Sequence, residues 1–377
     1  MDYPNAMRFK SLIITLLVVL TLGSTIDADA QRQNKYQKRK AKNKQISSYR
    51  GGRIGHSRFA PYSFVGGSIN ALNYFGDLAP VNRPGSTDIS FTRPGLGAFY
   101  GRKFHHSMSY RVAFNYGRLI GDDNTSDPTG GDDPSAASRY ERNLSFRNDI
   151  KEVSATLQID LLPNYGGPQS RMLINGYFFF GVAAFHHEPK GLVPDYDYQT
   201  YGFTPADGTP KLPNAGEWVK LRELGTEGQN YGVGTKYSPF QIAVPFGIGG
   251  EAFINQKISV GLELGVRKIF TDYIDDVGGT YFDLGAFDDN DALARIMSDR
   301  SVEPVAAITG ENRDLVLPHI DLRNYFENGE SYYHNWYNDT GRAVNDKRGT
   351  KAKDLYFMTQ IRVVYVLSNN SRRAKHR

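Results

Sequence analysis

Three adjacent residues, His186, His187 and Glu188, have the side-chain types that bind zinc, and His105 and His106 form a second pair. Neighbouring residues of a β-strand point to opposite faces of the sheet, so adjacent histidines do not easily chelate one ion. We therefore expect the first group to anchor a loop and the second to lie in a turn. The sequence predicts no metal site in either group.

A series of aspartates has the oxygen ligands that Ca²⁺ prefers. Their spacing does not match the EF-hand series, so a weak external Ca²⁺ site and a solvated loop both remain open interpretations. The segment 288–290 can instead cap a short helix from Asp291 to Met297. The aspartates are Asp272, Asp275, Asp276, Asp283, Asp288, Asp289 and Asp291.

Catalytic motifs give no support for an enzyme. A serine hydrolase needs a serine, a histidine and an acid that converge in space, and the sequence has no G-x-S-x-G string. His106 and Ser107 are neighbours in sequence only, and no Walker or dinucleotide glycine motif is present. The chain has no cysteine, which excludes thiol nucleophiles and thiolate metal sites. We predict no catalytic residue and no cofactor.

Alternation with a period of two predicts β-strands as the elements that hold these side chains. Along 108–117, one face carries the large apolar side chains of Met108, Tyr110, Val112, Phe114 and Tyr116. The same alternation marks 153–161, 241–254, 257–270 and 354–367, and less regular strands are predicted at 62–75, 93–104 and 172–187.

The other face of these strands carries glycine, serine, alanine and charged residues. Small and polar inside, large and apolar outside, is the arrangement of a transmembrane barrel, in which lumen charges can pair with one another. We therefore predict a structural polar network in the lumen, formed by Arg111, Glu251, Glu263, Arg267 and Arg362.

Short and long connections alternate along the eight strands. The short ones are 105–107, 163–171 and 255–256, and the long ones are 76–92, 121–143, 188–237 and 271–353. The sequence thus predicts an all-β fold over 59–367: an eight-stranded up-and-down transmembrane outer-membrane β-barrel with long external loops and periplasmic termini. Eight strands leave an interior that side chains just fill, so a pore is not expected.

The segments outside the barrel indicate export. Residues 1–30 resemble a signal peptide: an apolar core of about 13 residues at 11–23 precedes Ala28 and Ala30, and cleavage is expected after Ala30. Met7 can be the true start, and an uncleaved helical anchor is the alternative. Residues 31–58 are predicted to form a basic disordered periplasmic arm, and 368–377 a basic tail. Export argues against nucleic acid as a partner of the arm, whose lysine and arginine residues include Lys35, Lys38, Arg39, Lys40, Lys42 and Lys44.

Several strings resemble the PorG-like family of outer-membrane barrels of the type IX secretion and gliding machinery. The resemblance covers about 62–367 and implies a non-enzymatic role in contact with periplasmic ring proteins of that machine. The chain departs from the family in its basic arm, its 188–237 loop and its C-terminal tail. The strings lie at 65–68, 73–78, 116–119, 121–123, 142–147, 180–189, 271–277 and 298–301.

Three functions follow as hypotheses. The first is a structural or anchoring barrel in a secretion or envelope complex, with outer-membrane lipid and periplasmic ring proteins as partners. The second is a barrel whose external loops bind a surface or ligand, motivated by the tyrosines of 188–237. The third, a barrel hydrolase, has the least support.

Overall fold

The computed structural model describes residues 59–78, 92–127, 135–165, 168, 171–195, 212, 214–234, 236–288, 291–301, 303, 305–313, 347–349 and 354–367. The predicted signal peptide, basic arm and C-terminal tail lie outside these residues. Within the described part, no helix has the length and apolar character needed to cross a bilayer.

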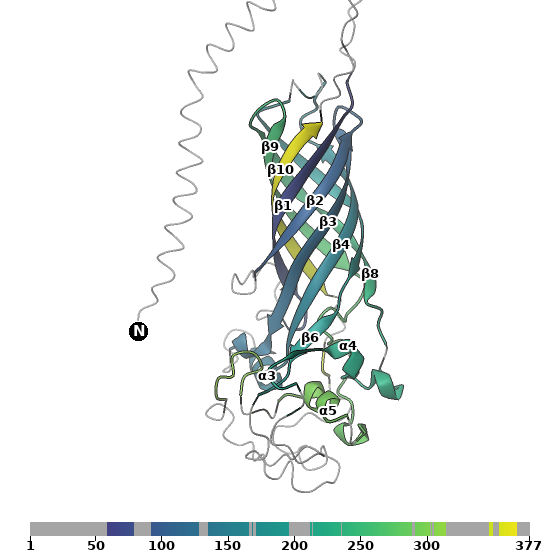
Figure 1. Ribbon diagram of the computed structural model, residues 1–377, viewed down its shortest axis with the longest axis vertical. Helices are drawn as coiled ribbons and strands as arrows, with labels where there is room; N and C mark the ends of the chain where they lie inside the picture. Colours follow the sequence, from purple (N-terminus) through teal and green to yellow (C-terminus); the bar gives the residue numbers. More distant parts are fainter. Residues whose placement is uncertain are drawn as a thin grey trace, which may run out of the picture. The chain divides into compact units, whose positions relative to one another are not determined.

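Eight long strands form a closed antiparallel barrel, which confirms the predicted fold (Figure 1). Each strand pairs with its neighbour around the ring, β3 pairs with β4, and β1 pairs with β10 from Ser63↔Leu367 to Phe75↔Leu355. The strands have 11 to 16 residues, enough for tilted strands to cross a bilayer. They are β1 (Tyr62–Phe75), β2 (Arg93–Lys103), β3 (Met108–Asp122), β4 (Ser145–Asp160), β5 (Ile174–His186), β8 (Phe240–Phe253), β9 (Ile258–Ile269) and β10 (Leu355–Leu367).

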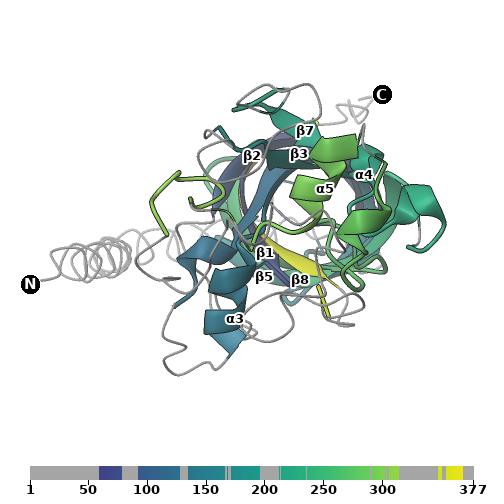
Figure 2. The ribbon, with the colours of Figure 1, turned by 90° about the horizontal axis from the view of Figure 1, so that it is seen from below.

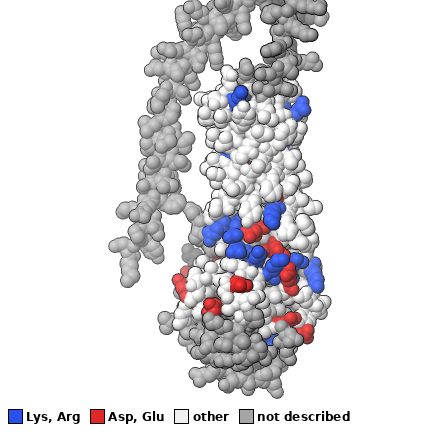
Figure 3. Space-filling view, viewed as in Figure 1, with Lys and Arg blue, Asp and Glu red and all other residues white. Residues whose placement is uncertain are grey.

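The outer wall of the barrel is apolar and exposed. Large side chains project from every face of the ring, among them Ile69, Phe114, Val182, Ile242 and Leu262, which are 50–64% exposed. Figure 3 shows this wall as an almost uncharged surface. An apolar surface that is continuous around a barrel is stable only in contact with lipid. The wall therefore fits a transmembrane barrel.

Glycines make room inside the barrel for aromatic side chains that the sequence analysis did not place there. A Cβ at Gly66 would lie 2.3 Å from the Phe99 ring, and one at Gly249 would lie 2.2 Å from the Tyr177 ring. The prediction of a small and polar inner face is therefore incomplete. The polar middle of the lumen lies between two apolar clusters, one of which contains Phe64 and Phe99 near the short turns.

The long connections fold into a cap at one end of the barrel (Figures 1 and 2). Strand β6 extends the sheet at β4, and β7 pairs with β6. Seen along the barrel, α4 and α5 lie across part of the opening and α3 lies at its edge. The cap elements are η2 (Asp123–Thr125), α3 (Ser135–Arg142), β6 (Pro189–Leu192), β7 (Trp218–Lys220), α4 (Leu221–Leu224), η4 (Gln229–Tyr231), η5 (Leu284–Ala286) and α5 (Ala292–Ser298).

The predicted start of β4 at Val153 is wrong, because the strand begins at Ser145. Its first half runs beside the cap, where inward residues such as Phe146 are buried and outward residues such as Arg147 and Lys151 are charged. Outward charge hides the apolar alternation on which the prediction depended. Strand β3 is longer than predicted for the same reason, and its outward face ends with Arg118 and Ile120.

Candidate functional site: the barrel lumen and its two ends

A buried ion pair crosses the middle of the lumen. Arg111 on β3 donates two hydrogen bonds to Glu263 on β9, from Nη1 to Oε2 at 2.7 Å and from Nη2 to Oε1 at 2.9 Å. Arg362 places its Nη1 3.2 Å from the same carboxylate, and the Tyr177 hydroxyl donates to it at 3.0 Å. Two parallel hydrogen bonds to one carboxylate fix the side chains of Arg111 and Glu263. Strands β3, β5, β9 and β10 are thus joined through Glu263.

A second carboxylate, Glu152, organises the lumen closer to the cap. It accepts hydrogen bonds from the Tyr356 hydroxyl at 2.7 Å and from Nδ2 of Asn115 at 2.9 Å. Nε of Arg267 lies 3.5 Å from Glu152 Oε2. Because these side chains are buried and fill the cross-section, the lumen holds a packed polar core, as expected for eight strands.

The structure brings together three of the five lumen residues named from the sequence: Arg111, Glu263 and Arg362. Arg267 lies with Glu152 instead, and Glu251 lies toward the short turns, 4.0 Å from Arg362. Sequence reasoning missed Glu152, which lies one residue before the predicted start of its strand.

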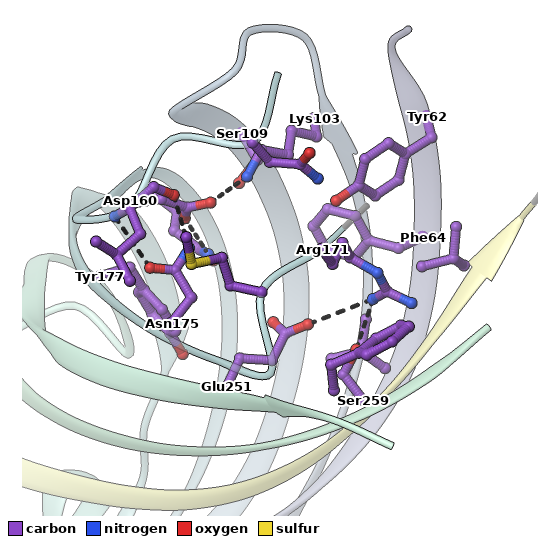
Figure 4. Close-up of a pocket in the computed structure, with 17 residues that line it drawn as sticks. Tyr62, Phe64, Lys103, Ser109, Asp160, Arg171, Asn175, Tyr177, Glu251 and Ser259 are labelled. Carbon is purple, nitrogen blue, oxygen red and sulfur yellow. Dashed lines mark hydrogen bonds and ion pairs between the residues drawn. The ribbon is translucent and has the colours of Figure 1, made fainter. Parts of the chain in front are cut away.

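A shallow polar socket occupies the end of the barrel that carries the short turns (Figure 4). Arg171 reaches into it from the connection between β4 and β5, donates to Ser259 Oγ at 2.6 Å and lies 3.7 Å from Glu251. On the opposite wall Lys103 pairs with Asp160. The cavity is about 60 Å³, which is room for a few water molecules. The cavity is thus too small for an organic ligand.

At the opposite end, a tyrosine joins two buried carboxyls at the barrel mouth. The Tyr74 hydroxyl lies 2.6 Å from Asp275 Oδ2 and 2.9 Å from Asp354 Oδ1. A hydroxyl has one proton to donate, so both contacts are hydrogen bonds only when one carboxyl is protonated and donates in turn. Burial raises the pKa of both aspartates well above the usual range, and neighbouring carboxylates add to the effect. The Tyr74 hydroxyl therefore joins the loop after β9 to the residue that precedes β10.

Four buried arginines connect the segments of the cap. Arg142 pairs with Asp123 at 2.7 and 2.8 Å and also donates to the backbone oxygens of Asp77 and Arg348, at 2.7 and 2.6 Å. Arg348 pairs with Glu227 at 3.0 Å and donates to the Asp276 carbonyl at 2.7 Å. Through these two guanidinium groups, five segments far apart in sequence are held in one arrangement.

The other two arginines act in the same way. Arg300 pairs with Glu303 at 2.8 and 2.9 Å, and Arg313 donates to the Tyr140 carbonyl at 2.7 Å. Arg142 and Arg300 belong to strings that carried the family resemblance, and the structure gives both a structural role. Neither was named as a site residue, because nothing in the local sequence indicates which distant carbonyls an arginine will contact.

The acidic segment does not gather its carboxylates around one point. Asp276 accepts from the hydroxyls of Tyr237 and Thr226, both at 2.5 Å. Asp283 accepts from the Gly285 backbone N–H at 2.9 Å, and Asp291 accepts from Tyr231 at 2.5 Å. Among the described residues, no three histidine or carboxylate side chains are placed to hold a metal ion. The solvated-loop interpretation is also wrong for Asp275 and Asp276, which are buried.

The predicted short helix at this segment is confirmed as α5 (Ala292–Ser298), but its predicted cap is wrong. The N-cap residue is Asp291, and its side chain makes no capping hydrogen bond. That carboxylate is instead engaged by Tyr231, which packs against Phe282 and Phe287. Tertiary contacts therefore engage the carboxylate of Asp291, a residue that the sequence analysis placed inside the helix.

The adjacent histidines have different surroundings. His186 packs against Phe240, whereas His187 stacks on Tyr237 and shares a hydrogen bond with the Ser238 carbonyl at 3.1 Å. Burial lowers the pKa of His187 to about 4, so its imidazole is neutral at pH 7 and donates this bond. His106 lies in a short turn, with Nδ1 2.9 Å from Ser107 Oγ, and its ring makes tilted contacts with the rings of His105 and Tyr165. In both histidine pairs, the side chains thus pack against residues of the neighbouring connections.

A family model described as a domain of unknown function (DUF6089) matches residues 60–202. A search of curated proteins returns no match.

Three solved structures are among those that resemble the chain. Each alignment covers 81% of this chain. Ail, the attachment invasion locus protein of Yersinia pestis, is 6% identical with a TM-score of 0.29 over 97% of its chain. Neisserial surface protein A is 6% identical with a TM-score of 0.31 over 98% of its chain. CarO2 of Acinetobacter baumannii is 8% identical with a TM-score of 0.21 over 99% of its chain. The strand pairing of this chain itself shows the barrel fold.

Proposed function

We propose that this chain is a non-enzymatic β-barrel of the bacterial outer membrane that anchors an envelope complex of the type IX secretion kind. The packed lumen supports this role most directly. Arg111, Glu263 and Arg362 fill its middle, and the cap covers part of its outer end. A barrel that is filled in this way has no water-filled passage to offer, so its working surfaces are its two ends and its wall.

The orientation follows from the alternation of the connections. Outer-membrane barrels have short periplasmic turns and long external loops. The start of β1 and the end of β10 lie side by side at the short-turn end, since Ser63 pairs with Leu367. In this orientation both termini and the polar socket face the periplasm, and the cap faces the exterior.

The socket is the surface that we assign to a periplasmic partner. Arg171 and Glu251 place opposite charges in the socket, with side chains that are 9% and 23% exposed, and Tyr62 and Phe253 line it beside them. Arginine and aromatic residues are enriched in protein interfaces, and Arg171 lies 4.6 Å from the centroid of the Phe253 ring. The predicted ring-protein partner would contact this end.

The external-loop alternative receives less support from the described residues. Tyr231 and Tyr237, two tyrosines of the long connection between β5 and β8, hydrogen bond to aspartates within the cap. These hydrogen bonds stabilise the loop.

A pull-down from gently solubilised outer membranes tests the proposal. A tagged wild-type chain is expected to recover periplasmic secretion-ring proteins, and the Arg171→Gln/Glu251→Gln variant to lose them while the folded barrel keeps its heat-modifiable mobility on a gel. The matched control is Arg222→Gln/Glu223→Gln, two charged residues of the cap, which should recover the same proteins as wild type. A folded wild-type barrel that is recovered alone would refute the anchoring role.

A further inference from the structure

Three cations on the outer wall near the cap form no ion pair within 4 Å with a carboxylate of the described residues, although Asp149 lies on the same face of β4 between two of them. Arg147 and Lys151 lie on the outward face of β4, and Lys190 of β6 is the register partner of Arg147. The other nearby cations are neutralised: Arg118 by Asp149 at 2.6 Å, and Lys220 by Glu223 at 2.9 Å and Glu188 at 3.2 Å. We call Arg147, Lys151 and Lys190 the basic triad.

The triad lies where the apolar wall ends. Lys151 pairs with Tyr116 across the β3–β4 ladder, and Val153, the next outward residue on β4, is 53% exposed on the lipid-facing wall. Outward side chains that are two residues apart on a strand lie about 7 Å apart. Lys151 therefore lies one outward step from the lipid-facing wall, and Arg147 lies three outward steps, about 20 Å along β4, from Val153. The triad thus extends from the edge of the apolar wall toward the cap.

Tryptophan contributes to the same patch. The Arg147 guanidinium lies 4.4 Å from the centroid of the Trp218 ring, which holds it at a fixed place on the surface. Nε of Arg147 is buried and has no hydrogen-bond partner among the described residues. Tryptophan is enriched at the membrane–water boundary, so its position agrees with headgroup depth.

Like charges this close repel one another unless an anion lies between them. Cross-strand partners have Cβ atoms about 5 Å apart, which is the case for Arg147 and Lys190. Figure 3 shows lysine and arginine, with aspartate and glutamate among them, in a band between the uncharged wall and the cap. Phosphate has the charge and the acceptor oxygens that match a fixed arginine with a lysine beside it.

We propose that the basic triad binds the phosphate groups of a phosphorylated lipid headgroup in the leaflet next to the cap. The site itself is independent of the proposed function, but its assignment to the outer leaflet rests on the orientation given there. The apolar wall holds the acyl chains, and the triad holds the headgroup of the same molecule.

Native mass spectrometry of the full chain in detergent tests this proposal. The probes are bis-phosphorylated lipid A and its dephosphorylated form, which has the same acyl chains. Wild type is expected to retain the phosphorylated probe preferentially. Each near-surface cation contributes about fivefold to binding an anionic lipid, so Lys151→Gln/Lys190→Gln should weaken it about 25-fold.

The charge-matched control is Arg102→Gln/Lys257→Gln, which removes two exposed cations at the short-turn end. It should bind the probe as wild type does, and all variants should keep heat-modifiable mobility. Equal loss in both double variants, or equal retention of both probes by wild type, would overturn the proposal. Displacement of the lipid by millimolar inorganic phosphate would also overturn it, because the triad would then be a site for free anions. These outcomes do not depend on recovery of periplasmic proteins, so the two proposals can fail separately.

Discussion

The side chains of Arg111 and Glu263 form two hydrogen bonds of 2.7 and 2.9 Å across the barrel. Their strands, β3 and β9, are not neighbours in the ring. The pair therefore acts as a cross-brace, because it links walls that backbone hydrogen bonds do not link directly. Arg362 and Tyr177 also depend on the same carboxylate.

We predict that Glu263→Gln destabilises the barrel strongly. The substitution leaves two buried guanidinium groups facing a neutral amide, and removal of one partner of a buried pair costs about 3–5 kcal/mol. Urea unfolding in detergent micelles, followed by gel mobility, measures the loss. Glu223→Gln, at an exposed pair of the cap, is the control and should change stability by less than about 1 kcal/mol. A Glu263 variant as stable as this control would contradict the bracing role.

A glycine pair on β1 tests how the lumen is packed. Gly66→Ala should destabilise the barrel by about 1–3 kcal/mol, because its Cβ would lie 2.2 Å from the Val363 carbonyl oxygen and 2.3 Å from the Phe99 ring. Gly67→Ala is the matched control on the same strand, since its nearest neighbour would be 3.6 Å away. The same unfolding assay should separate the two variants, and equal midpoints would show that the Phe99 side chain does not need the space at Gly66.

Asp276 gives the cap a defined pH dependence. Burial raises the pKa of Asp276 to about 6, against the opposing charge of Arg348. A carboxyl whose pKa is raised on folding contributes stability that is fully present below its unfolded pKa of about 4 and is lost as pH rises through about 6. Amide hydrogen exchange of 271–288 should therefore become faster, after correction for intrinsic rates, between pH 4 and 7. Asp276→Asn should flatten this trend, and a variant with the wild-type pH profile would rule out Asp276 as the cause.

Arg142→Lys should loosen the cap and leave the barrel closed. An ammonium cannot reproduce the fork that reaches Asp123 together with the carbonyls of Asp77 and Arg348. We expect limited proteolysis to cut the cap segments several times faster, while the heat-modifiable mobility is kept. Arg222→Lys, at a partly exposed position, is the control. If both variants resist protease equally, Arg142 does not hold the cap together.

The sequence alone was sufficient to predict the eight-stranded ring and the residues on its inner and outer faces. Val112, Phe114 and Tyr116 alternate with Arg111, Ala113 and Asn115 because lipid requires apolar side chains at every second residue, and a period of two can be read from one strand alone. Arg111, Glu263 and Arg362 could be named as lumen residues for the same reason.

The remaining features depend on contacts between distant residues. Phe99 fits inside because Gly66 lies beside it on the neighbouring strand, and only the register of β1 and β2 reveals this pairing. Arg142 donates a hydrogen bond to the Arg348 carbonyl, which is 206 positions away in the sequence. Neither relationship leaves a local pattern, so periodicity could not predict the filled ends of the lumen or the ordered cap.

The pairing of β1 with β10 has a consequence for assembly. Ser63 and Leu367 are about 300 positions apart, and their strands join along 13 register pairs to close the ring. Contacts between such distant residues form slowly, because the loop-closure entropy is lost before any contact compensates for it. Until β10 arrives, both β1 and β9 present open edges that can pair with another chain. We therefore expect the unclosed sheet to depend on chaperones or an insertion catalyst, with the seam between the first and last strands forming as the final, rate-limiting step of assembly.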